Sequence, residues 1–362
     1  MARRLTFAYP GNINTLTGGY IYDKRIIGEL IAQGWLVETL SLDDRFPQVS
    51  DAVRADTCRT LARVATDRQL VIDGLALGAL GQDAQLIAQS RPFIALVHHP
   101  LALESGLDAN TARSLQHSEQ TAISYAQGVI VTSAITKQTL VDLFGVEPNK
   151  IAVILPGIDR PTPTPPTPPK SPTGQASAPG SAVRLLSVGA IVPRKGFDVL
   201  LAALVSLKHL NWRLTIVGDD QRAPLTTEAL RQTITEHGLQ DRIVLAGAQP
   251  ASELAAHYQQ ADVFVLASRY EGYGMAYAEA LAWGLPVIGT DAGAARDTLA
   301  TPAAQTVPTK DIGALADAIE RLVEDTTLRA KMRQAAVAHA QTLPTWKDSG
   351  AQFAQTLIQM NK

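Results

Sequence analysis

The sequence predicts two α/β domains, each built on a parallel sheet covered by helices on both faces. Short continuous runs of Val, Ile and Leu alternate with helix-length segments along the 362 residues, and such runs are typical of strands buried on both faces. The alternation stops once, at residues 161–180, where eight of the 21 prolines gather, and it then restarts. A chain of this length accommodates two hydrophobic cores.

The expected strands follow this alternation on both sides of the proline-rich segment. Before it, we expect strands at 5–9, 36–40, 69–73, 93–98, 128–133 and 151–155, with helices at 20–33, 109–125 and 135–144. After it, we expect strands at 184–188, 213–217, 243–246, 263–267 and 286–290. We therefore assign residues 1–160 and 181–344 to two doubly wound domains. Residues 161–180 are interpreted as a semi-rigid linker, with a proline-rich docking segment as the alternative.

Composition excludes several classes of protein. The formal net charge is −2 and no block of like charges occurs, which argues against a nucleic-acid binder. Cys58 is the only cysteine, so neither an intrachain disulfide nor a cysteine metal cluster is expected, and a reducing compartment is favoured. We interpret Cys58 as a half-buried residue on a helix. Without a signal-peptide-like or membrane-spanning apolar run, the sequence predicts a cytoplasmic protein with at most peripheral membrane contact.

Two loops of the first domain follow strands, where doubly wound folds bind ligands. Gly18 and Gly19 stand between a strand and a helix, an arrangement that admits a phosphate but also serves as a simple tight turn. His98 closes a strand and is followed by His99; it is a candidate for binding or polarising a sugar hydroxyl, for accepting a proton, or for a structural role. No D-x-D or H-E-x-x-H sequence occurs, so no metal site is expected.

Two loops of the second domain carry charged residues. Arg194 and Lys195 follow its first strand and suit a diphosphate, although a solvated basic turn has the same composition. Glu271 lies in a glycine-rich loop and Glu279 in the helix that follows. Carboxylates accept hydrogen bonds in pairs, which suits vicinal hydroxyls of a ribose or hexose. An acid–base pair of the glycosidase type, or structural roles for both glutamates, are the alternatives.

Taken in order, these stretches resemble a known family. The sequence from about residue 5 to 340 is similar to retaining glycosyltransferases of family four, through "LVHHP", "VGAIVPRKGFDVLLAAL", "WRLTIVGDD" and "SRYEGYGMAYAEALAWGLPVIGTDAGA". The glutamate pair with its glycines is the most specific part. The resemblance implies the GT-B architecture, two facing Rossmann-like domains with the active site in the cleft between them. It also implies that the helix at 345–362 returns to the first domain.

The resemblance assigns roles to the candidate residues. It implies that Glu279 binds the donor ribose, Glu271 holds the transferred sugar, and Lys195 neutralises the leaving diphosphate. His98 would lie near the donor sugar, with Gly18 and Gly19 beside the phosphates and acceptor. Backbone amides facing the sugar and diphosphate would come from Gly272, Tyr273, Gly274 and Met275. The implied reaction transfers a hexosyl group from a nucleotide-diphosphate sugar with retention, and needs neither metal nor cofactor.

Two departures from the family pattern leave parts of this interpretation open. Ala190 stands where the family has an arginine on the diphosphate, and Arg194 is a candidate replacement. Asp297 stands where the family has a glutamate. A nucleotide-sugar epimerase and a catalytically silent nucleotide-sugar-binding protein are the alternative functions. The sequence does not specify the donor base, the sugar or the acceptor, and a lipid acceptor stays open.

Overall fold

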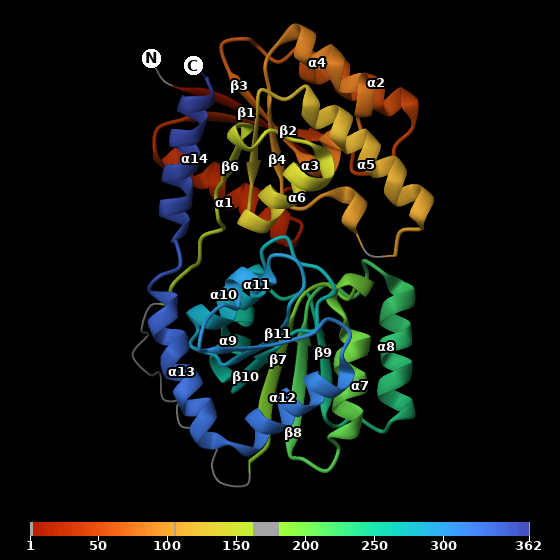
Figure 1. Ribbon diagram of the computed structural model, residues 1–362, viewed down its shortest axis with the longest axis vertical. Coiled ribbons are helices and arrows are strands. Elements are labelled where there is room, and N and C mark those ends of the chain that lie inside the picture. The colour runs from red at the N-terminus through yellow and green to blue at the C-terminus, as the bar shows by residue number, and fades with distance from the viewer. Residues whose placement is uncertain (1–2, 105, 162–180, 362) are drawn as a thin grey trace. The chain divides into compact units, whose positions relative to one another are not determined.

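The computed structural model describes residues 3–104, 106–161 and 181–361. The chain forms two compact units, one made of Met1–Gly157 with Pro344–Lys362 and the other of Ile158–Leu343. Each unit contains a six-stranded parallel sheet flanked by helices (Figure 1). Apart from Pro161, the predicted linker at 161–180 lies outside the described residues.

In the first unit, successive strands are added to one side of β1 and then to the other, although all strands are parallel. Its strand order is β2-β1-β3-β4-β5-β6, so β1 lies between the next two strands of the chain. This is the topological switch point of a doubly wound sheet, and ligands bind beyond the carboxyl ends of the strands there. The strands are β1 (Arg4–Pro10), β2 (Leu36–Leu42), β3 (Gln69–Asp73), β4 (Ile94–Val97), β5 (Gly128–Val131) and β6 (Ile151–Val153).

The helices of the first unit begin at polar capping residues. Side chains of Thr17, Ser50, Asp108 and Ser133 accept backbone N–H groups in four first turns, as capping residues do. The helices are α1 (Gly18–Ala32), α2 (Asp51–Ala62), α3 (Gly74–Leu77), α4 (Ala84–Ser90), α5 (Ala109–Ser124), α6 (Ala134–Phe144) and α14 (Trp346–Met360), with 3₁₀ turns η1 (Gly81–Asp83), η2 (Leu101–Leu103) and η3 (Pro148–Lys150).

Helix α14 belongs to the first unit although it follows the whole second unit in the chain. It starts with a capping box between Thr345 and Asp348, which fixes its first turn. It packs on α1 so closely that a Cβ at Gly350 would lie 2.3 Å from Glu29 Cβ. The Ser349 hydroxyl donates to the Leu155 carbonyl at 2.7 Å.

The sheet of the second unit shows the same reversal in the order of its strands. Its strand order is β12-β11-β10-β7-β8-β9, so its switch point lies at the carboxyl ends of β7 and β10. The strands are β7 (Val183–Val188), β8 (Trp212–Val217), β9 (Ile243–Gly247), β10 (Val263–Val265), β11 (Val287–Thr290) and β12 (Ala304–Val307). The helices are α7 (Phe197–Ser206), α8 (Pro224–Glu236), α9 (Ala251–Gln260), α10 (Met275–Ala282), α11 (Ala295–Thr298), α12 (Ile312–Glu324) and α13 (Thr326–Ala340), with the 3₁₀ turn η4 (Pro193–Lys195).

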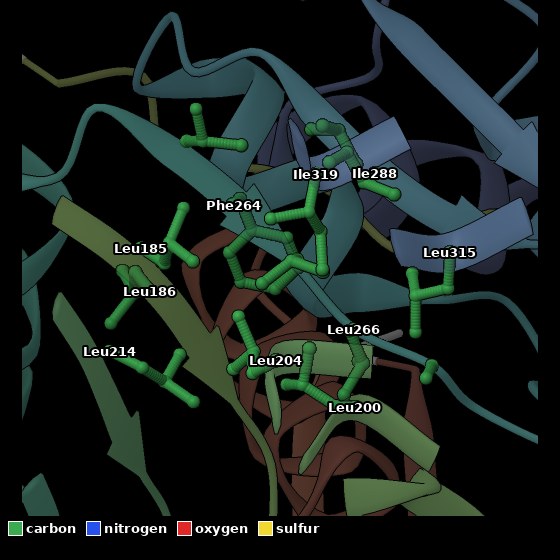
Figure 2. Close-up of a cluster of buried hydrophobic side chains, with 14 of the residues drawn as sticks. Leu185, Leu186, Leu200, Leu204, Leu214, Phe264, Leu266, Ile288, Leu315 and Ile319 are labelled. Atoms are coloured by element: carbon green, nitrogen blue, oxygen red, sulfur yellow. The ribbon is translucent and has the colours of Figure 1, made fainter. Parts of the chain in front are cut away.

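The core of the second unit lies on both faces of its sheet, and part of it is formed by helices α7 and α12. Figure 2 shows side chains of strands β7, β8, β10 and β11 gathered with side chains of helices α7 and α12. Phe264 lies at the centre of this group and is fully buried. Burial of apolar side chains stabilises such a core by about 25 cal/mol per Å² removed from water. The labelled residues are Leu185, Leu186, Leu200, Leu204, Leu214, Phe264, Leu266, Ile288, Leu315 and Ile319.

The structure corrects three details of the sequence interpretation. Cys58 on α2 is buried rather than half-buried, with 1% of its surface exposed, and burial raises the pKa of its thiol to about 12. Gly18 and Gly19 are the first two residues of α1, not part of the turn before it. Strand β12 was not predicted, because only Val307 of its four residues is buried. No helix of the described chain has the length and apolar character needed to cross a bilayer.

Candidate functional site

In the second unit, the loop after β7 brings Arg194 and Lys195 to the switch point. Both lie on η4, which is followed by its C-cap residue Gly196 in the left-handed region with φ 65°. A Cβ at Gly196 would lie 1.9 Å from the Ala267 carbonyl oxygen, so only glycine allows this approach. The close contact places the two cations against the loop that follows β10.

Glu271 lies in that second loop and binds the cations. One carboxylate oxygen, Oε1, accepts hydrogen bonds from Lys195 Nζ and Ser268 Oγ, both at 2.6 Å. The other oxygen lies 3.5 Å from Arg194 Nη1. Burial alone would raise the pKa of Glu271, but Lys195 and Arg194 outweigh it and hold the pKa below its usual range. The site therefore contains an ionised carboxylate between two cations.

Backbone contacts fasten the two loops to each other. Arg194 Nη1 donates to the Tyr270 carbonyl at 3.0 Å, and the Arg269 N–H donates to the Arg194 carbonyl at 2.7 Å. The segment after β11 adds a third layer, because the Ala294 N–H donates to the Glu271 carbonyl at 2.8 Å. Side-chain and backbone groups of three loops thus fix the position of the carboxylate.

Residues 272–275 lead from this loop into α10. Gly274 is the N-cap residue, with φ 91° and no side-chain cap, and a Cβ there would lie 2.7 Å from the Tyr277 ring. The first N–H groups of an uncapped helix favour negatively charged ligands. The Tyr273 ring is buried with Ile158 and Ala278.

Glu279 lies on α10 and is held by a tyrosine from α9. Its Oε2 accepts a hydrogen bond from the Tyr258 hydroxyl at 2.9 Å. The Tyr258 ring is buried and stacks on Phe264 and Trp283, each with a centroid distance of 6.2 Å. Glu279 itself is partly exposed, so its carboxylate is positioned by protein on one side and open to solvent on another.

In the first unit, His98 follows β4 and meets two aspartates. Its Nε2 lies 3.0 Å from Asp23 Oδ1 on α1 and 3.3 Å from Asp73 Oδ2 at the end of β3. Gly19 lies beside the ring, since a Cβ there would be 3.1 Å from His98 Cδ2. The nitrogen and one oxygen of each carboxylate lie within 4.8 Å of one another, close enough to share a proton or a cation.

The loop after His98 is held by a buried glutamate of α5. Glu119 on α5 is buried, and its Oε2 accepts the Leu101 N–H at 2.9 Å. Burial raises the pKa of Glu119 to about 8, since an ionised carboxylate loses hydration there. His99 takes a different partner, Glu104, with 3.2 Å between Nε2 and Oε2. The two adjacent histidines therefore contact different carboxylates, His98 those of Asp23 and Asp73 and His99 that of Glu104.

The structure gathers the predicted residues at the switch points of their own sheets. Gly18, Gly19 and His98 form one group in the first unit. Arg194, Lys195, Glu271, Gly272, Tyr273, Gly274, Met275 and Glu279 lie on the two loops and helix α10 in the second. Asp297 lies on α11 with an exposed side chain.

Sequence reasoning missed three residues of these groups, namely Asp23, Asp73 and Ser268. Asp73 ends a strand at the switch point, so the rule that selected His98 would have found it. Ser268 lies three residues before Glu271 in the same loop. Asp23 carried no signal that sequence alone provides, because its contact with His98 joins residues 75 positions apart.

Comparison with known proteins decides the family. A model of the group 1 glycosyl transferases matches residues 175–339, and a model of glycosyltransferase family 4 matches residues 70–160. The chain belongs to the glycosyltransferases that these two models describe, one for each part of the chain. Together the two matches cover more than half of the chain.

Named relatives and solved structures agree with this assignment. A D-inositol 3-phosphate glycosyltransferase of Kineococcus radiotolerans is 27% identical over 239 residues, 62% of this chain and 55% of its own length. A GDP-mannose-dependent alpha-(1-6)-phosphatidylinositol monomannoside mannosyltransferase of Mycolicibacterium smegmatis is 33% identical over 177 residues, 46% of this chain and 45% of its own. The chain spans only 54–60% of the length of five D-inositol 3-phosphate glycosyltransferases that it matches.

Two solved structures show the fold. Sucrose-phosphate synthase of Thermosynechococcus elongatus superposes with a TM-score of 0.82 at 20% identity, covering 99% of both chains. The Anabaena HepE protein in complex with UDP and glucose superposes with a TM-score of 0.73 at 18% identity, covering 98% of both. The two units therefore have the GT-B fold of two Rossmann-like domains.

Proposed function

We propose that this chain transfers a hexosyl group from a nucleotide-diphosphate sugar to a hydroxyl acceptor. The observation that carries the proposal is the group of Lys195, Arg194 and Glu271 at the switch point of the second sheet. Two cations fixed beside an uncapped helix start form a site for a diphosphate. The family assignment favours this reaction over an epimerase or a silent nucleotide-sugar-binding protein.

The proposed mechanism depends on stabilising the leaving nucleotide. Negative charge grows on the diphosphate as the glycosidic bond breaks, and Lys195 and Arg194 are held in place to offset it. Glu271 keeps the Lys195 ammonium positioned through the 2.6 Å contact and offers its second oxygen to sugar hydroxyls. Glu279, braced by Tyr258, binds the ribose hydroxyls. Arg194 takes the part of the arginine that the family carries at position 190.

We propose retention of the anomeric configuration without a divalent ion. In this scheme the acceptor attacks on the face that the diphosphate leaves, so no side chain forms a covalent intermediate. Glu271 suits this scheme, because its carboxylate already binds Lys195 and Ser268 and is poorly placed to act as a nucleophile. The two fixed cations supply the charge that a metal ion supplies in other transferases. Product stereochemistry and activity in excess chelator test these two points.

The donor is proposed to be a UDP or GDP sugar. One relative is named for its dependence on GDP-mannose, and one structural neighbour was crystallised with UDP and glucose. The acceptor stays a hydroxyl of unassigned identity.

Calorimetric titration with UDP-, GDP- and ADP-sugars tests the donor site directly. We expect one base to bind, and Glu279→Ala to weaken its binding at least tenfold. Glu253→Ala serves as the matched control, since Glu253 is an exposed glutamate on neighbouring α9. Failure of all three donor classes to bind, or equal losses in the two variants, would contradict the proposal. Unchanged donor turnover in Arg194→Ala would reject its role as the replacement arginine.

A further inference from the structure

Asp23, Asp73 and His98 bring two carboxylates to a single ring nitrogen. Asp23 Oδ1 and Asp73 Oδ2 lie 3.0 and 3.3 Å from His98 Nε2, and one nitrogen or oxygen of each residue lies within 4.8 Å of the others. The side chains of the two aspartates are 0% and 5% exposed. Within the described chain no lysine or arginine forms an ion pair with either carboxylate, so the imidazole is their only ion-pair partner.

The side chains around this group do not balance its charge. Two ionised carboxylates beside a neutral imidazole carry two negative charges, and burying uncompensated charge is costly. Two additional protons or one divalent cation would neutralise the group. A proton on Nε2 has one direction in which to donate, whereas a metal ion binds several ligand atoms at once. The meeting of both carboxylates at the same nitrogen therefore favours a cation.

The second oxygen of Asp23 is an independent indication of a missing partner. Oδ2 is buried and has no hydrogen-bond partner among the described residues, although Oδ1 contacts His98. A buried oxygen of this kind loses its hydration without compensation. Carboxylates coordinate metal ions through one or both oxygens, so an ion held by Asp23 would supply the partner that the protein does not.

The other two side chains are already oriented as ligands. Asp73 Oδ1 accepts the Leu75 N–H at 2.7 Å, while its Oδ2 is the oxygen next to His98. The Tyr22 ring meets the imidazole edge-on, with 5.3 Å between centroids. Outer contacts of this kind fix metal ligands in place. The His98 side chain is 18% exposed, which leaves the site reachable from solvent.

The separations of the ligand atoms match a first-row metal ion. Zn²⁺ lies about 2.0–2.2 Å from imidazole nitrogen and carboxylate oxygen. Ligands at about 2.1 Å are about 3.4 Å apart in a tetrahedron and about 3.0 Å apart in an octahedron. The separations of 3.0 and 3.3 Å fall between these values. An imidazole ligand favours Zn²⁺ and its neighbours over Mg²⁺ and Ca²⁺, which prefer oxygen.

We propose that Asp23, Asp73 and His98 bind a divalent transition-metal ion, with Zn²⁺ the best match, at the carboxyl edge of the first sheet. The ion is structural: it ties α1 to the ends of β3 and β4, and it takes no part in the charge stabilisation proposed for Lys195 and Arg194. No short sequence motif reveals it, because the three ligands are far apart in the chain. All of them belong to the first unit, so the site does not depend on the proposed function.

Metal content and thermal unfolding of the full-length protein, prepared without a histidine tag, test the site with Zn²⁺ alone as the probe. After chelator treatment and dialysis against a micromolar excess of Zn²⁺, we expect one bound equivalent. Zn²⁺ at about a hundred times its dissociation constant should raise the midpoint of thermal unfolding by about 5–10 °C. Asp23→Asn and His98→Gln should each weaken binding at least tenfold and abolish the shift.

Glu104→Gln is the matched control, because it removes the carboxylate that contacts the neighbouring His99 and should keep the full equivalent of Zn²⁺. A wild type that binds no Zn²⁺ would overturn the proposal and leave protons as the occupants of the cluster. Equal binding in wild type, Asp23→Asn and His98→Gln would also overturn it, because the ion would then lie elsewhere.

Stability without metal separates loss of the site from loss of the fold. Metal-free Asp23→Asn should unfold at the same temperature as metal-free wild type or at a higher one, because the substitution removes a buried charge that lacks its counter-ion. A lower midpoint in this variant would contradict the proposal, since the protein itself would then stabilise the Asp23 carboxylate.

Discussion

The contact between Lys195 and Glu271 should be measurable as a coupling energy in unfolding. Lys195→Met keeps the length of the side chain and removes its charge. A hydrogen bond to a charged group contributes about 1.5–3 kcal/mol, and loss of a sole partner of a buried ion costs about 3–5 kcal/mol. Glu271 keeps Ser268 at 2.6 Å and Arg194 at 3.5 Å. Because Glu271 keeps these two partners, we expect Lys195→Met to lower the free energy of unfolding by about 2–3 kcal/mol and not by the full cost of an unpaired buried ion.

A double-mutant cycle with Glu271→Gln isolates this energy. Once either partner is gone, removing the other should cost about 2 kcal/mol less than it does in wild type. Urea unfolding of the full chain should be followed by tryptophan fluorescence in a background that lacks Trp35 and Trp346. Trp212 and Trp283 then report on the second unit alone. Single-variant costs that add within about 0.5 kcal/mol would refute the reasoning, because independent sites behave that way.

Three further predictions follow from individual side chains. Gly196→Ala should destabilise the protein clearly more than Gly238→Ala in urea unfolding, because both have φ near 65° but only the first Cβ would lie 1.9 Å from a carbonyl oxygen; equal costs would contradict this. Glu119, whose pKa rises to about 8 on folding from 4.5, should make stability fall by about 1.4 kcal/mol per pH unit between those values, and Glu119→Gln should remove that slope; a variant with the same pH profile as wild type would reject it. Tyr258→Phe should weaken donor binding about tenfold, roughly the worth of one hydrogen bond to Glu279, and calorimetry showing unchanged affinity would reject that role.

The sequence predicted the sheets well because buried parallel strands have continuous apolar runs. The 69–73 run matches β3 as observed, and 36–40 falls within β2. The half-exposed β12 lacks such a run and escaped notice. Strand ends at the switch points also led to Lys195 and Glu271, although not to the contact between them.

The rest of the site depends on tertiary contacts that leave no local pattern. Asp23 looks like any polar residue on an amphipathic helix, and only the placement of α1 beside β4 brings it to His98. Glu279 was identified, but the tyrosine that braces it comes from another helix. Such pairs are set by packing, so propensity and spacing do not contain them.

The position of α14 has a consequence for how the protein is made. On the ribosome, residues up to Gly157 emerge first, yet the helix that covers α1 is translated only after the entire second unit. Until then the surface of α1 at Glu29, on which Gly350 packs, is uncovered, and Tyr22 lacks its edge contact with the Trp346 ring. The second unit is a continuous stretch of chain and is free to complete its fold earlier. Synthesis order therefore favours maturation of the second unit before the unit that carries His98.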